Sequence, residues 1–199
     1  MVDLLIRRGA HIERGKDPSA VLWIATYRGH APIVDLLISK FKGLHPNDKA
    51  ELARFLDQKP HPRAGHQILW VACTSHSPDV VRILVENGAE YRSNWYGASP
   101  LLATATWLCP NITELLLKYH SQGALDVHLN ERARNGRTAL FEAVACHRPR
   151  IVRMLLDANA DYLIPDNENA TCVHLAAHNE NPDVMEMILN KVVRGDGTV

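Results

Sequence analysis

The residues of this chain with the greatest potential for chemistry are its eleven histidines and four cysteines. His174 and His178 lie four residues apart, a spacing that puts two imidazoles on one face of a helix, where both could bind one zinc ion. The stretch from one to the other is HLAAH, so it lacks the glutamate that acts as general base in an H-E-x-x-H zinc protease. No third or fourth ligand lies near them in the sequence. We therefore predict no metal site and no bound cofactor.

A cysteine–histidine nucleophile is a second possibility, because Cys146 directly precedes His147. Adjacent residues on a helix point in different directions, so these two side chains do not face each other as a nucleophile and its base must. The patterns G-x-S-x-G, G-x-x-x-x-G-K and G-x-G-x-x-G do not occur in the chain. A small-molecule or metal site lined by His61 and His66 stays open as an alternative. The sequence otherwise predicts no catalytic residue and no enzyme.

The balance of charge narrows the choice of partner. Lys+Arg and Asp+Glu both total 22, so the formal net charge is zero, whereas nucleic-acid binding needs a clustered basic excess. No apolar run is long enough to cross a membrane, and the first ten residues lack the apolar core of a signal peptide. The cysteines form no C-x-x-C pair and fit free thiols in a reducing compartment. We expect a protein of the cytoplasm or nucleus that does not insert into membranes.

A recurring sequence pattern predicts the secondary-structure elements that position these histidines and cysteines. It appears five times, and the small residue in the middle of each copy gives the landmarks Ala25, Ala72, Thr104, Ala143 and Ala176. The separations are 47, 32, 39 and 33 residues, so a period near 33 underlies the chain, with insertions in the first and third gaps. Each copy has a short apolar pattern and then a stronger one with the i, i+3, i+4 spacing of an amphipathic helix. Each copy is therefore predicted to be a helix, a tight turn and a second helix.

Helices of two to three turns are not stable alone in water and must bury their apolar faces on neighbouring copies. This requirement predicts an all-α solenoid in which alanines at the landmark positions allow close packing. Gly88 and Asn159 follow second helices, where a left-handed helix terminus is expected.

These copies resemble the ankyrin repeat, whose signature is T-P-L-H-x-A followed by G-H, an I-V-x-L-L helix and G-A-D. The best matches are TALFEAVA with IVRMLLDANAD, and TCVHLAAH with Asp166 before it. The resemblance covers nearly the whole chain. It implies stacked helix–turn–helix units with short hairpin-like connecting loops. His174 holds the family's histidine position, where it is implied to order the turn between neighbouring repeats. The other copies replace that histidine by Trp23, Trp70, Leu102 and Phe141.

The resulting division is one domain over 1–199. Its parts are a half repeat at 1–12, repeat 1 at 13–38, a helical insertion at 39–62, repeat 2 at 63–92, repeat 3 at 93–118, a loop insertion at 119–131, repeat 4 at 132–162, and repeat 5 with a C-terminal tail at 163–199. The first insertion is predicted to form a helix from about Asp48, with Asn47 as its N-cap. The two insertions are either additions without a function, which a repeat array tolerates, or loops that bind a partner. The apolar residues Leu4, Leu5 and Ile6 need a neighbouring element to bury them. We therefore expect a longer repeat array, or another element that covers them, at that end.

The resemblance implies that a partner protein contacts the hairpin tips and the exposed face of the first helices. Residue types that dominate interface energies occur there, at Tyr27, Arg28, Trp95, Tyr96, Trp107, Arg134, Arg137 and His178. The alternatives are that Trp95 folds over a neighbouring tip and that Trp107 belongs to the core. Trp23 and Trp70 occupy equivalent positions in adjacent copies and are interpreted as packing residues.

The function predicted from the sequence is a non-enzymatic scaffold that binds another protein through a concave face of hairpins and first helices. The alternative is a regulatory or targeting ankyrin array within a larger enzyme or effector, whose chemistry lies in sequence outside this chain.

Overall fold

The computed structural model describes residues 18–46, 48–57, 67–94 and 97–195, and within these ranges it contains helices and no strand. The predicted all-α fold is confirmed. The chain divides into two compact units, Met1–Trp95 and Tyr96–Val199, and each is described by itself. The helices are α2 (Pro18–Tyr27), α3 (Ala31–Leu44), α4 (Lys49–Asp57), α5 (Ile68–Thr74), α6 (Pro78–Glu86), α7 (Pro100–Thr106), α8 (Pro110–Ser121), α9 (Ala139–Ala145), α10 (Pro149–Asp157), α11 (Cys172–His178) and α12 (Pro182–Gly195).

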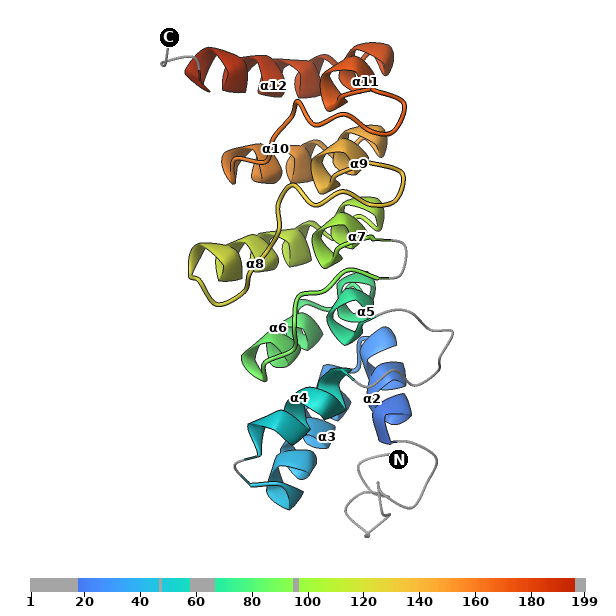
Figure 1. Ribbon diagram of the computed structural model, residues 1–199, viewed down its shortest axis with the longest axis vertical. Coiled ribbons are helices and arrows are strands. Elements are labelled where there is room, and N and C mark those ends of the chain that lie inside the picture. The colour runs from blue at the N-terminus through green and yellow to red at the C-terminus, as the bar shows by residue number, and fades with distance from the viewer. Residues whose placement is uncertain (1–17, 47, 58–66, 95–96, 196–199) are drawn as a thin grey trace. The chain divides into compact units, whose positions relative to one another are not determined.

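The first unit contains the helix pairs α2–α3 and α5–α6, with α4 between them in the sequence. The first helix α2 packs against α5, and the second helix α3 packs against α6 (Figure 1). The core of this unit is formed by buried leucines from all four helices, namely Leu22, Leu37, Leu69 and Leu84.

The second unit stacks the pairs α7–α8, α9–α10 and α11–α12. The first helices α7, α9 and α11 form one layer, and the second helices α8, α10 and α12 form the other (Figure 1). Leu101 and Leu140 are buried in the first layer, and Leu116, Leu155 and Ile188 are buried in the second. The helix–turn–helix units predicted from the repeated phrase are present.

The landmark residues explain why the layers can approach so closely. Ala72, Ala143 and Ala176 are all buried. In the third copy the landmark is Thr104, whose hydroxyl donates to Leu101 O at 2.7 Å and accepts from the Thr113 hydroxyl at 2.8 Å. The hydroxyl is therefore satisfied inside the core, and the repeat tolerates threonine where the other copies have alanine.

Local sequence sets where most helices begin. Proline occupies the first turn of α6, α8 and α10, where its missing N–H costs no hydrogen bond. The first helices α7 and α9 begin at hydroxyl caps: Ser99 accepts from Leu102 N at 3.1 Å, and Thr138 accepts from Phe141 N at 3.2 Å.

The turn between the two helices of every copy contains one residue with positive φ. This residue is Gly29 (70°), His76 (58°), Leu108 (55°), His147 (54°) or Glu180 (50°). At the ends of second helices, Gly88 and Asn159 also have positive φ, as predicted. The left-handed turn is thus a property of the fold, because four non-glycine residues of three types adopt it at one repeat position.

The first insertion forms a helix, as predicted, but its cap differs. Glu51 N donates to Asp48 Oδ1 at 2.9 Å, so Asp48 caps α4, while Asn47 lies outside the described residues. Phe55 is buried and stacks on Phe41 of α3, with ring centroids 4.2 Å apart. The insertion therefore extends the hydrophobic core of its unit.

The predicted loop at 119–131 begins later than expected. Helix α8 continues to Ser121, and Gly123 then takes a positive φ of 68°. Leu125 and Val127 are buried after it, and Asn130 Oδ1 accepts from Asp161 N at 2.9 Å. The repeated apolar pattern does not continue to Ser121, so it did not predict the last turn of α8. The remaining repeat boundaries stay predictions.

Candidate recognition surface

The hairpin tips of repeats 4 and 5 have the same backbone geometry. In repeat 4, Ala133 N donates to Arg137 O at 3.0 Å and Gly136 has a φ of 80°. In repeat 5, Asp166 N donates to Ala170 O at 2.8 Å and Asn169 has a φ of 61°. Each tip is therefore a closed, hydrogen-bonded turn whose left-handed residue is glycine or asparagine, the types that adopt this conformation most readily.

Asn167 joins the two tips. Its backbone N donates to Asn135 O at 3.2 Å, and its side-chain Nδ2 donates to Arg134 O at 2.8 Å. Arg132 adds a bond from Nε to Gly136 O at 3.0 Å. These bonds fix the backbone of the predicted partner-binding residue Arg134, whose side chain is exposed.

Arg137, another predicted partner-binding residue, is engaged within the stack. Its Nη1 lies 3.4 Å from Glu142 Oε1, and its Nε lies 3.7 Å from Oδ2 of buried Asp166. Its guanidinium carbon lies 5.0 Å from the centroid of the Phe141 ring. These contacts give Arg137 a role in joining repeats 4 and 5, and a contact with a partner stays a prediction.

Trp107 and its neighbour Leu108 form an exposed apolar pair at the end of α7. Their exposed fractions are 54% and 48%, so Trp107 does not belong to the core. The backbone is fixed there, since Trp107 N donates to Ala103 O at 2.9 Å and Cys109 N donates to Thr104 O at 3.0 Å. Sequence reasoning missed Leu108. The available signal was a leucine at a turn position where the other copies have glycine, histidine or glutamate.

The first unit presents Tyr27 and Arg28 at the corresponding end of α2, and both side chains are exposed. The Tyr27 ring stacks on Trp23, with centroids 5.5 Å apart and planes within 8°. Trp23 and Trp70 are half-buried, which agrees with a packing role. The other tip aromatics of the prediction, Trp95 and Tyr96, lie outside the described residues, as do His61 and His66.

His178 is exposed at the end of α11, and His174 acts at its start. His174 Nδ1 accepts from Thr171 N at 3.1 Å and lies 2.8 Å from the Thr171 hydroxyl. The histidine in the family position therefore orders the beginning of its own helix. Within the described ranges, no three His, Cys, Asp or Glu side chains are grouped so that they could hold a metal ion.

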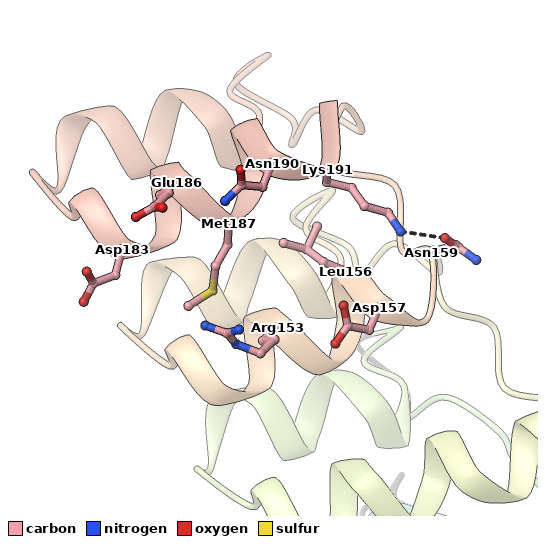
Figure 2. Close-up of a pocket in the computed structure, with 9 residues that line it drawn as sticks. All are labelled: Arg153, Leu156, Asp157, Asn159, Asp183, Glu186, Met187, Asn190 and Lys191. Carbon is pink, nitrogen blue, oxygen red and sulfur yellow. Dashed lines mark hydrogen bonds between the residues drawn. The ribbon is translucent and has the colours of Figure 1, made fainter. Parts of the chain in front are cut away.

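A polar groove runs between the second helices α10 and α12 of the second unit (Figure 2). Arg153 and Asp157 line it from α10, and Asp183 and Glu186 line it from α12. Lys191 Nζ donates to Asn159 Oδ1 at 2.8 Å and closes one end. A groove in the first unit is lined by Lys42, His45, Asp48, Lys49, Leu52 and Glu86. Neither set includes a serine or cysteine that could act as a nucleophile beside a base.

The buried cysteine of repeat 5 lies in an environment that disfavours its thiolate. Cys172 donates from Sγ to Tyr162 O at 3.0 Å, and burial raises the pKa of its thiol to about 12. The thiolate, which is the reactive form, is therefore disfavoured at neutral pH. Among the described helices, none is long and apolar enough to cross a membrane.

The paired helices, positive-φ turns and joined tips define a helical repeat protein. The model of the family "Ankyrin repeats (3 copies)" matches residues 1–94 and 122–196. The chain belongs to the ankyrin repeat family, which is generally non-enzymatic and serves as a protein–protein interaction module. It is also 28% identical over 121 residues, 60% of its length, to Alpha-latrotoxin-Lg1a of Latrodectus geometricus. The match spans only 9% of that protein.

The family match leaves out residues 95–121, the irregular third copy. The structure nevertheless forms the pair α7–α8 there. The copy that departs most from the family pattern is thus the one that presents Trp107 and Leu108.

Proposed function

We propose that this chain is a non-enzymatic scaffold that binds a partner protein through the edge formed by its hairpin tips and the ends of its first helices. The observation that carries the proposal is the exposed pair Trp107–Leu108 on a hydrogen-bonded, left-handed turn. Exposed apolar surface of this kind costs hydration free energy in the absence of a partner. A rigid aromatic anchor loses little conformational entropy when it is buried in an interface.

Further support comes from side chains at register-equivalent ends of the first helices. Tyr27 ends α2 and Arg28 follows it, and His178 ends α11, all with exposed side chains. Arg134 adds an exposed guanidinium at a fixed tip. Within the second unit, the partner that these residues fit has an apolar pocket for Trp107 and a carboxylate-bearing rim for Arg134.

A second candidate function is a regulatory or targeting array within a larger protein. The observation that favours it is the match to a 121-residue stretch that makes up 9% of a long protein. The complete reading frame that contains this chain separates the two functions, because a flanking catalytic domain supports the second one. The four free cysteines support a reducing compartment, cytoplasm or nucleus, for either; microscopy of the tagged chain tests that location.

The test of the scaffold function is quantitative affinity capture followed by calorimetry with the recovered protein. The Trp107→Ala variant should bind about thirtyfold more weakly, the equivalent of ~2 kcal/mol for an interface anchor. Leu163→Ala is the matched control, since Leu163 is exposed but lies in the connector before α11. Equal affinity of the Trp107→Ala variant and the parent chain for every recovered protein would contradict the proposal.

A further inference from the structure

Two adjacent turns of the second unit carry an apolar pair and a pair of arginines. The turn of repeat 3 exposes Trp107 and Leu108. The turn of repeat 4 contains the half-buried Arg148, and the exposed Arg150 follows it in the first turn of α10. We call these four residues the turn patch. Its apolar half is the anchor of the proposed function, whereas its two arginines have no part in that function so far.

The turns of neighbouring repeats lie against each other. In the first unit, a Cβ atom on Gly29, the positive-φ residue of its turn, would be 3.2 Å from the Cβ of Ser77 in the next turn. Leu108 holds the register position of Gly29, and Arg148 holds that of Ser77. In the second unit α7 packs on α9 and α8 packs on α10 (Figure 1). The same register therefore brings the apolar pair of repeat 3 beside the arginines of repeat 4.

Arg148 lacks the acceptors that other arginines of this unit have. The guanidinium groups of Arg132, Arg137 and Arg150 each lie beside a carbonyl or carboxylate oxygen. Arg148 Nε is buried and has no hydrogen-bond partner among the described residues. Buried polar atoms are nearly always paired, because an unpaired one costs free energy. The unpaired Nε therefore indicates an acceptor that the described residues do not supply, and an anionic oxygen is the strongest one for a guanidinium.

The charges around the turn patch favour a peptide carboxylate over the phosphates of a nucleic acid. In repeat 5 the register position of Leu108 is the exposed Glu180, and that of Arg150 is the exposed Asp183. Glu114 Oε2 lies 3.3 Å from Arg150 Nη2 and offsets part of its charge. A nucleic-acid strand needs a row of cations and would meet these acids. Two arginines confined to repeat 4 instead fit one or two carboxylates.

We propose that the turn patch binds an acidic, apolar segment of another protein in an extended conformation across repeats 3 and 4. An aromatic or leucine side chain of the segment packs on Trp107 and Leu108, and a carboxylate three residues away binds Arg148 and Arg150. Helices of neighbouring repeats lie about 8–10 Å apart, and residues i and i+3 of a polyproline II segment lie on one side about 9 Å apart. Both contacts therefore form together. The inference rests on the proposed scaffold function and names the chemistry of the partner.

The test uses the full chain as bait and a phage-displayed library of random linear peptides as the probe. Selected peptides should carry Asp or Glu three residues from an aromatic residue or leucine. Fluorescence anisotropy with a synthetic peptide of the selected sequence then measures affinity. Arg148→Gln in the chain should weaken binding about tenfold. With a peptide whose acid is replaced by Gln, the same variant should cause no further loss, because both changes remove one contact. Arg153→Gln is the matched control, since Arg153 is exposed on α10 but lines the groove toward α12.

Charge reversal gives a second test. Arg148→Glu should bind a peptide with Lys in place of the acid more tightly than the acidic peptide. The Arg148 side chain makes no cap bond to α10, so both variants should keep the helical fold, which circular dichroism checks.

Selected peptides without an acid, or no enriched sequence at all, overturn the proposal. Tighter binding of a single-stranded oligonucleotide at the same ionic strength also overturns it. If Trp107→Ala weakens peptide binding and Arg148→Gln does not, the scaffold function stands and the acidic partner is wrong. If neither substitution weakens binding, both proposals fail.

Discussion

Gly136 lies directly against Asn167 of the next hairpin. A Cβ atom on Gly136 would be 2.4 Å from Asn167 Oδ1 and 2.6 Å from its backbone N. The φ of Gly136 is also 80°, in the left-handed region. The hydrogen bonds from Asn167 to the neighbouring tip therefore require glycine at position 136 for two reasons. The backbone there is left-handed, and there is no room for a Cβ atom.

We predict that Gly136→Ala lowers the free energy of unfolding by about 2–3 kcal/mol, as a strained φ and a steric displacement combine. Urea denaturation followed by circular dichroism measures the change. Gly88→Ala is the matched control: Gly88 has a φ of 86°, but a Cβ there meets nothing within 4 Å. The control should lose only about 1–2 kcal/mol, the cost of the left-handed backbone. Equal losses in both variants would show that the tip contact contributes nothing.

The positive-φ turns between paired helices lead to a stabilising prediction. His147 has a φ of 54° with an exposed side chain, and Gly29 shows that glycine fits the same register position. His147→Gly should raise the free energy of unfolding by about 0.5–1 kcal/mol. Removing the Cβ relieves the cost of the left-handed backbone, about 1–2 kcal/mol. Part of this gain is lost because glycine increases the conformational entropy of the unfolded chain. Thermal melts check the sign. His178→Gly, within α11, should instead destabilise by about 1 kcal/mol.

A structural feature could be predicted from the sequence where the residues that form it recur in the repeated copies. The alanine landmarks and the apolar stripe recur, so the helix pairs, their turns and the ends at Gly88 and Asn159 were predictable. Contacts between unlike side chains have no such signal. The bond from Asn167 to Arg134 O and the engagement of Arg137 by Glu142 and Asp166 depend on how two neighbouring tips meet.

The contacts of helix α4 and the exposure of Trp107 also depend on residues that do not recur in the repeated copies. The apolar residues of α4 indicated a helix, but the sequence did not show that Phe55 meets Phe41, because this contact has no counterpart in other copies. Trp107 could be either core or surface on its pattern alone. The exposed fraction of Trp107, 54%, decides the matter, and it depends on neighbouring elements that the pattern does not show.

The cysteines should differ sharply in reactivity. Cys146 is half-exposed, while Cys73, Cys109 and Cys172 are buried. In the native chain at pH 8, a thiol reagent followed by mass spectrometry of peptides should label Cys146 first, because access and thiolate fraction both control the rate. Labelling of Cys172 at the rate seen in urea would contradict its burial.

The raised pKa of Cys172 also predicts a dependence of stability on pH. The pKa of the thiol is near its ordinary value of 9.0 in the unfolded chain, and burial raises the pKa to about 12 in the folded chain. Below pH 9 both states are protonated and this group gives no pH dependence. Above pH 9 the folded chain binds more protons than the unfolded chain, so stability falls as pH rises, by at most about 1.4 kcal/mol per pH unit. Urea midpoints of the parent chain and Cys172→Ala between pH 8 and 10.5 measure the difference, and parallel pH profiles would rule out this cause.

Helix α4 provides the test of whether the first insertion is structural. Phe55 is buried and its ring is nearly parallel to that of Phe41, with planes within 5°. Phe55→Ala should lower the free energy of unfolding by about 3–5 kcal/mol, because it leaves a cavity the size of a phenyl ring and removes the stacking contact. Arg54→Ala, on the exposed side of the same helix, loses only a surface ion pair with Glu51 and should change stability by less than about 1 kcal/mol. Urea denaturation of both variants distinguishes a core element from decoration: if Phe55→Ala is as stable as Arg54→Ala, α4 contributes nothing to the core of its unit.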